Sequence, residues 1–367
     1  MRSERVDRRL LRAPGCFALN TLLLLVAACG QFGTSKHAWE APPPPLKVGP
    51  IVDPSVLTRS ELPNGLRILV LEDHRLPTVS LSVAVARGAG AEDPARAGVA
   101  TFLAELMNRG AGKRDALQLA QAVDALGANL SASAGWDSMN VGIVGLSRDF
   151  PALLEILADV VRDPQLEASE AEKTRREQLA ALEADKDDPG TLARWRAMSV
   201  LYPHHRYGLP VMGTSETVAG LDAAAARELH KRYLVPGNAI VGVSGDVDPT
   251  QVLKQITESF QNWKEGPLPG QAPSTAAETP AARRIVIVDR PELVQARIIV
   301  THEGIDRLDP RRISAGLLND TLGGSGFSSR LMKELRSEEG LTYGVHSGFI
   351  LRRQAGPFRV STFTRVP

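Results

Sequence analysis

The sequence contains very little cysteine and few aromatic residues. Its 367 residues include two cysteines, and aromatic side chains make up 5% of the chain. Cys16 lies inside an N-terminal leader, so Cys29 alone is expected to remain in the mature chain. A single cysteine can form neither an intramolecular disulfide nor a thiolate-rich metal site. Both kinds of site are therefore excluded.

The chain also lacks an excess of charge of either sign. Its formal charge is +1, from 43 Lys and Arg against 42 Asp and Glu. Removal of the leader takes away five arginines together with Glu4 and Asp7, which brings the charge to −2. This balance argues against a nucleic-acid-binding surface. The hydrophobic content of 43% is ordinary for globular protein and sufficient for two cores.

The leader contains an apolar run that is too short to cross a membrane. Residues 19–28 form a mostly apolar run and follow a basic region that contains Arg2, Arg5, Arg8, Arg9 and Arg12. The small residues directly before Cys29 resemble a bacterial lipoprotein cleavage and lipidation site. We therefore expect a signal peptide over residues 1–28, with a plain secretory leader as the alternative. Because Gly30 is not the aspartate that resembles an inner-membrane retention signal, we expect Cys29 to anchor the protein to the periplasmic face of the outer membrane.

Two proline-rich stretches divide the rest of the chain. Residues 29–54 include four consecutive prolines and predict a semi-extended tether. Residues 266–282 are rich in Pro, Ala, Ser and Thr and predict a linker. The predicted domains are therefore residues 55–265 and 283–367.

The two domains look like copies of one pattern. Matching apolar strands are expected at 67–71 and 284–288, and at 78–86 and 296–301, and each half then opens a helix at an Asp-Pro pair (93–94 and 309–310). In the first half this helix is expected to run through 99–107. Further helices are expected at 116–126, 149–161, 167–186 and 222–233, and further strands at 129–134, 139–146 and 239–244. This pattern predicts an α+β fold in which each half has a mostly antiparallel sheet covered by helices on one face.

The second half looks shorter than the first. Residues 343–364 match the hairpin near residues 130–146, and the first half continues for over a hundred residues beyond that point. By its own duplication, the second half lacks its last helices and a strand. We therefore expect this half to be incomplete and to leave an apolar face uncovered.

Residues 322–345 form the most informative stretch. Gly323, Gly324 and Gly326 predict a flexible turn, and Ser328 or Ser329 could cap the helix that follows. No Gly-Lys-Ser/Thr follows these glycines, which excludes a phosphate loop. Gly340 stands where a helix C′ residue belongs, and 341–345 alternate like a strand. A helix, a turn and a returning strand would place Arg336 near Tyr343.

This segment resembles the C-terminal substrate-binding signature of the pitrilysin-type peptidases, which include insulinase and mitochondrial processing peptidase relatives. The resemblance rests on Ser-Ser-Arg-Leu at 328–331, on Arg336 and on Tyr343 followed by Gly-Val. It implies that Arg336 and Tyr343 hold the substrate peptide near the zinc site of the other half. Taken alone, the pair would be a surface arginine and a half-buried strand tyrosine.

The resemblance extends over nearly all of the chain from residue 57 to the end. In the first half it rests on five short motifs, at 64–67, 93–100, 203–208, 233–238 and 245–247. Active members have His-x-x-Glu-His on the helix after the second motif, where two histidines four residues apart ligate zinc and the glutamate is the general base.

This motif is absent here. The resemblance places Thr101 and Glu105 at the histidine positions and Ala104 at the position of the general base. The third zinc ligand of the family falls on Ala181, although Glu177 and Glu183 lie within a turn of it. No metal is therefore expected in this chain, and without zinc and a base, catalysis by the chain alone is not expected.

The remaining histidines and serines do not replace this site. No two histidines have helical i, i+4 spacing among His37, His74, His204, His205, His230, His302 and His346. His204 and His205 are adjacent in a proline-flanked loop, which favours a structural role. Ser328 and Ser329 lack a paired His/Asp motif.

Three functions follow from the resemblance. The first is a non-catalytic, substrate-binding subunit of a heterodimeric peptidase of the bacterial envelope. A related subunit would then supply His-x-x-Glu-His and the zinc. The second is a peptide-binding or scaffold protein of peptidase ancestry with no role in proteolysis. The third is a lone metallopeptidase with a rearranged site.

Overall fold

A computed structural model describes residues 56–268, 270 and 282–366 of the chain. The predicted leader with Cys29, the tether at 29–54 and most of the linker at 266–282 lie outside these residues and stay predictions. None of the helices in the described ranges is long and apolar enough to span a bilayer.

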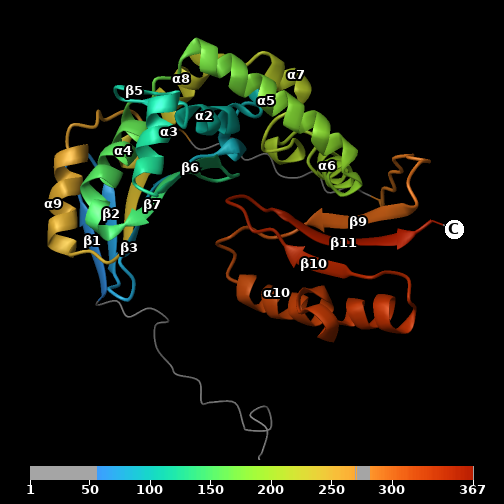
Figure 1. Ribbon diagram of the computed structural model, residues 1–367. Helices are drawn as coiled ribbons and strands as arrows, with labels where there is room; N and C mark the ends of the chain where they lie inside the picture. Colours follow the sequence, from blue (N-terminus) through green and yellow to red (C-terminus); the bar gives the residue numbers. More distant parts are fainter. Residues whose placement is uncertain (1–55, 269, 271–281, 367) are drawn as a thin grey trace, which may run out of the picture. The chain divides into compact units, whose positions relative to one another are not determined.

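The first half is built on a six-stranded sheet with the strand order β1-β2-β8-β3-β7-β6 (Figure 1). Neighbouring strands are antiparallel, except that β2 and β8 are parallel. Every second residue of β3 is buried, as its alternating sequence TVSLSVAV predicts. The strands are β1 Leu57–Glu61, β2 Arg67–Glu72, β3 Thr78–Val85, β6 Asn129–Ala134, β7 Met139–Leu146 and β8 Ala239–Gly245. A short hairpin, β4 Gly110–Ala111 and β5 Arg114–Asp115, forms a separate pair.

Helices α2, α4 and α9 contact this sheet (Figure 1). Most buried hydrophobic side chains of this half form one continuous core. The first-half helices are α2 Val99–Met107, α3 Ala116–Ala125, α4 Phe150–Arg162, α5 Ala168–Asp187, α6 Pro189–Leu201, α7 Ser215–Ala219, α8 Ala223–Tyr233 and α9 Pro249–Phe260. The five helices expected in this part of the chain are confirmed within two residues at each end.

Helices α6, α7 and α9 are present but were not predicted, and α6 and α9 share one kind of start. Each begins at an Asp-Pro pair, with proline in the first turn, where its missing N–H is not needed. Asp188 accepts a hydrogen bond from the Thr191 amide at 2.7 Å, and Asp248 accepts one from the Gln251 amide at 2.8 Å. These N-caps satisfy donors that the first turn leaves unpaired.

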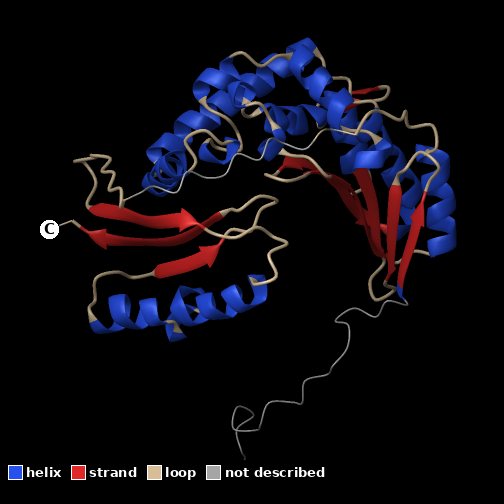
Figure 2. Cartoon of the chain, turned by 180° about the vertical axis from the view of Figure 1, so that it is seen from behind, coloured by secondary structure: helices blue, strands red, loops and turns tan. Residues whose placement is uncertain are grey.

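The second half has a three-stranded antiparallel sheet in the order β10-β11-β9. It repeats the β6-β7-β3 part of the first sheet, which supports the predicted duplication. Helix α10 lies along one face of this sheet, next to β10 (Figures 1 and 2). The elements are β9 Gln295–Glu303, α10 Arg312–Asn319, β10 Val345–Phe349 and β11 Pro357–Arg365, with short helical segments at Asp320–Gly324, Gly326–Ser328 and Met332–Glu338.

The predicted strand at 284–288 is wrong. These residues form no regular secondary structure and belong to no sheet, and Ile285 and Ile287 are 80% and 85% exposed. In the first half, the matching strand β2 obtains its hydrogen bonds from β1 and β8. The described second half has no strand equivalent to either, so the apolar segment has no ladder to join.

The strand predicted to follow Gly340, from residue 341, begins later than expected. Gly340 has the positive φ of +63° expected at a helix C′ position. The strand starts only at Val345, because nearby groups already bond the preceding backbone. Leu341 N–H donates to the Leu335 carbonyl, and Gly344 N–H donates to the Thr342 hydroxyl. The serine caps are not formed either, since the hydroxyls of Ser328 and Ser329 donate to the carbonyls of Ser325 and Gly326.

The second half has almost no core of its own. Its buried hydrophobic residues, within the described range, are Met332 and Val345. Ile313, Leu317 and Leu318 of α10 are each at least 65% exposed. The expectation of two cores is therefore wrong for the described chain. On the sheet itself, Ile298 and Val300 of β9 are 42% and 61% exposed, and the expectation that missing helices would cover such a face stays a prediction.

Candidate functional site

The residue before α2 fixes where this helix begins. Gly98 is the N-cap with φ +97°, and a Cβ atom there would lie 2.5 Å from the Met212 carbonyl oxygen. Only glycine fits this combination of positive φ and close backbone approach. The Glu92 carboxylate accepts hydrogen bonds from the amides of Gly98 (3.0 Å) and Ala100 (2.6 Å) and so caps the first turn.

Glu92 also forms a buried ion pair with Arg206. The nearest oxygen–nitrogen distance is 2.7 Å, and the two side chains are 0% and 3% exposed. Burial raises the pKa of Glu92, against the opposing influence of the Arg206 guanidinium and the two amides. Arg206 also donates to three backbone carbonyls, those of Leu209, Pro210 and Val211. The pair thus ties the start of α2 to the loop over residues 206–212.

The positions at which the resemblance places the zinc motif hold no ligand set. The half-buried Thr101 donates its hydroxyl hydrogen to the Val211 carbonyl at 3.3 Å. Ala104 is buried in the core, whereas Glu105 points to the exposed side of α2. Ala181 is an exposed residue of α5 and offers no donor atom. Threonine and alanine are not zinc ligands, so these residues do not fit the metal.

The two glutamates near Ala181 do not substitute for it. Glu177 pairs with Arg109 at 2.7 Å, and Glu183 pairs with Lys186 at 2.6 Å, all on the surface. Within the described residues, no three His, Cys, Asp or Glu side chains come together as a metal site. The expectation that zinc belongs to another subunit stays a prediction.

A pocket of about 340 Å³ opens beside Thr101. Its acidic residue is Asp185, one turn beyond Ala181 on α5, and its basic residues are Arg194 of α6 and Arg352 of the second half. The remaining lining residues are Ala134, Trp136, Trp195, Met198, Tyr207, Gly208, Leu209, Pro210, Val211 and Met212. The i, i+4 spacing from Ala181 could have pointed to Asp185. No local signal pointed to Arg352.

The second-half loop that contains Arg352 packs on an aromatic cluster of the first half, and both belong to the same compact unit. Tyr202 donates to the Ala355 carbonyl at 3.1 Å, and the Arg353 amide donates to Asp137 at 2.8 Å. His205 is buried and bonded at both ring nitrogens, to the Tyr207 amide and to the Gln354 side chain. Burial lowers the pKa of His205. These contacts agree with the structural role predicted for this histidine.

The structure brings Arg336 and Tyr343 together, as the sequence predicts. Arg336 Nη1 donates to the Tyr343 carbonyl oxygen at 2.8 Å, and the guanidinium carbon lies 4.1 Å from the centre of the Tyr343 ring. It also lies 4.5 Å from the ring of Phe327, which the sequence analysis did not single out. Tyr343 and Phe327 are 73% and 69% exposed. The charged group is therefore held between two accessible rings.

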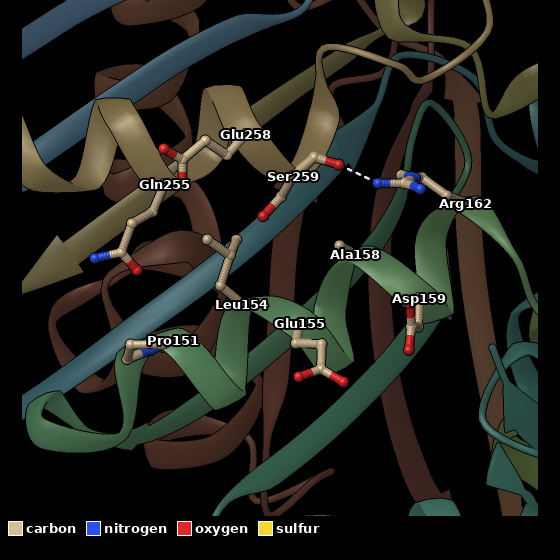
Figure 3. A pocket seen from close by; sticks show the side chains of 9 residues that line it. All are labelled: Pro151, Leu154, Glu155, Ala158, Asp159, Arg162, Gln255, Glu258 and Ser259. Carbon is tan, nitrogen blue, oxygen red and sulfur yellow. Dashed lines mark hydrogen bonds between the residues drawn. The ribbon is translucent and has the colours of Figure 1, made fainter. Parts of the chain in front are cut away.

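A second pocket lies between α4 and α9 and contains none of the motif residues (Figure 3). Its Arg162 donates to the Ser259 carbonyl, as the dashed line marks. Glu155 and Asp159 pair with Arg114, at 2.6 Å and 2.9 Å. Glu155, Asp159 and Arg162 of α4 are therefore already engaged in contacts with β5 and α9.

Two family models match the chain. The model for insulinase (peptidase family M16) matches residues 67–215, and the model for the peptidase M16 inactive domain matches residues 220–366.

Curated relatives and solved structures are also similar to this chain over most of its length. An uncharacterized zinc protease of Streptomyces coelicolor is 30% identical over 79% of this chain, which spans 63% of that relative's length. One of Bacillus subtilis is 24% identical over 80% of this chain and 70% of its own length. The crystal structure of a peptidase M16 inactive domain from Pseudomonas fluorescens superposes with a TM-score of 0.76 at 29% identity, covering 84% of this chain and 74% of that one. The structure of a protease from Helicobacter pylori has the same fold, with a TM-score of 0.77 at 20% identity. The match covers 84% of this chain and 75% of that one.

Proposed function

Because the chain belongs to the insulinase (M16) family of peptidases, we propose that it is the non-catalytic, substrate-binding subunit of a two-chain zinc peptidase. The single observation that supports this best is the contrast between two sites. The zinc-motif positions Thr101, Ala104, Glu105 and Ala181 hold no ligand set, whereas the half-buried Arg336 is in contact with the exposed Tyr343.

In this proposal the missing chemistry comes from a related chain. That partner supplies His-x-x-Glu-His and binds the zinc, and this chain contributes the Arg336 and Tyr343 side chains that bind the peptide. A gene for such a chain beside this one, and co-purification of the two products, would support the assignment. Copies that elute alone when both chains are co-expressed would contradict it.

We expect the isolated chain to bind no stoichiometric zinc and to cleave no peptide. Without a metal-bound water and a general base, both main sources of hydrolytic rate are missing. The measurements are metal analysis after dialysis against zinc and hydrolysis of a mixed fluorogenic peptide library. Chelator-sensitive cleavage that Glu105→Ala abolishes would instead establish a rearranged metal site in this chain.

We also propose that Cys29 anchors the protein to the periplasmic face of the outer membrane. Cys29→Ser is expected to abolish processing before residue 29 and to move the protein out of the lipid-modified fraction, because two or more acyl chains are needed for stable anchoring. Cys16→Ser, inside the leader, is the matched control and should change neither property. Metabolic labelling with a fatty acid and membrane fractionation measure both. A Cys29→Ser protein that is still membrane-bound and cut at the same residue would refute the anchor.

A further inference from the structure

Arg352 is a buried guanidinium that the protein leaves largely unpaired. The residue is 6% exposed, and its Nε and Nη1 atoms are buried without a hydrogen-bond partner in the described chain. Its ring contacts are with Trp136, at 4.2 Å, and Tyr207, at 4.4 Å. Cation–π contacts offset part of the cost of burying the charge, but they satisfy no N–H donor.

The nearby carboxylate is occupied elsewhere. Asp137 accepts hydrogen bonds from the Arg307 guanidinium at 2.7 Å and from the Arg353 amide at 2.8 Å. Burial lowers the pKa of Arg352 to about 10, so the group is still positively charged at neutral pH. A charged and unsatisfied donor that lines a cavity indicates a missing anionic partner.

We propose that the pocket beside Thr101 binds a carboxylate group through the guanidinium of Arg352. The charged lining residues are two arginines, Arg194 and Arg352, against the single acid Asp185, so the pocket favours an anion of low charge. Arg194 Nη2 is held by the Thr191 hydroxyl at 2.9 Å. Flat aromatic walls from Trp136, Trp195 and Tyr207 suit the apolar part of such a ligand.

The ligand is a peptide that contains an acidic group, and this choice of ligand class rests on the proposed function. The carboxylate belongs either to an aspartate or glutamate side chain or to the C-terminus, since both present the same group to arginine. The pocket itself does not depend on a catalytic partner, so binding can be measured on this chain alone.

Three matched peptides separate the sources of the carboxylate. Acetyl-Ala-Glu-Ala-amide has a side-chain carboxylate, acetyl-Ala-Gln-Ala with a free C-terminus has a terminal one, and acetyl-Ala-Gln-Ala-amide has none. Binding is followed by calorimetry and by the fluorescence of Trp136 and Trp195. At least one acidic peptide should bind about 10-fold or more tightly than the neutral one, as expected for a charge-assisted hydrogen bond.

Arg352→Gln should abolish the preference for the acidic peptide, whereas Arg353→Gln, the adjacent control, should retain it. Arg352→Met should also raise the melting temperature of the unliganded protein, because it removes a buried and unpaired charge. Equal binding of all three peptides, no binding at millimolar concentration, or a preference that survives Arg352→Gln would overturn the proposal. None of these results would affect the role of Arg336 and Tyr343, which is tested by turnover of the reconstituted pair.

Discussion

Arg336→Ala is expected to lower peptide hydrolysis by the reconstituted two-chain peptidase about 100-fold, by analogy with the loss of an oxyanion-hole donor. Tyr343→Phe is expected to have a similar effect. The Arg336 guanidinium lies between the exposed rings of Phe327 and Tyr343 and is bonded to the Tyr343 carbonyl. A substrate strand would be held mainly by its backbone, with these two side chains at the carbonyls near the scissile bond.

The expected loss is in turnover as well as in binding. A hydrogen bond from a charged donor contributes about 1.5–3 kcal/mol, against roughly 1 kcal/mol for a neutral pair. If the hydrogen bond from Arg336 to the substrate strengthens as the scissile carbonyl oxygen gains negative charge, removal of this donor lowers kcat. Folding should change little, because an exposed cation–π contact contributes only about 0.5–1 kcal/mol.

Arg330→Ala is the matched control, since Arg330 is an exposed arginine of the same segment outside the Arg336–Tyr343 contact. Steady-state kinetics and size-exclusion chromatography of each reconstituted pair provide the measurements. Normal turnover after both Arg336→Ala and Tyr343→Phe would remove the catalytic-subunit function and leave the scaffold function.

Glu92→Gln is expected to reduce the free energy of unfolding by about 3–5 kcal/mol, because it leaves the Arg206 guanidinium buried without its counter-charge. The carboxylate also accepts the Gly98 and Ala100 amides, so the start of α2 loses acceptor strength at the same time. Arg206 holds the carbonyls of residues 209–211, and this loop lines the pocket beside Thr101. The substitution should therefore weaken ligand binding there as well as stability.

An exposed pair of the same chemistry provides the control. Arg96 and Glu228 are 2.9 Å apart with side chains 42% and 63% exposed, so Glu228→Gln should change stability by less than about 1 kcal/mol. Urea unfolding of the two variants measures the difference. A loss for Glu92→Gln no greater than that for Glu228→Gln would show that Arg206 finds another partner.

Much of the first half could be predicted from the sequence, because the signals are local. Strands β6 and β7 have the predicted bounds, and α2 spans the predicted residues 99–107. Apolar periodicity and caps act within about ten residues, so tertiary contacts need not be known. The same holds for Arg336 and Tyr343, which one helix end and the turn at Gly340 bring together. Helices α6, α7 and α9 were missed, although the Asp-Pro caps of α6 and α9 were visible in the sequence.

The remaining features depend on partners distant in the sequence. Residues 284–288 have the composition of a strand, yet they stay unpaired because pairing needs a second strand that the described chain does not provide. The ion pair of Glu92 with Arg206 and the position of Arg352 against Trp136 each join segments more than a hundred residues apart. The sequence by itself therefore determined the family, the absence of His-x-x-Glu-His and the Arg336–Tyr343 pair. Only the tertiary structure decided which charges are buried, which of them lack a partner and where a ligand pocket opens, because burial is a property of packing between distant segments.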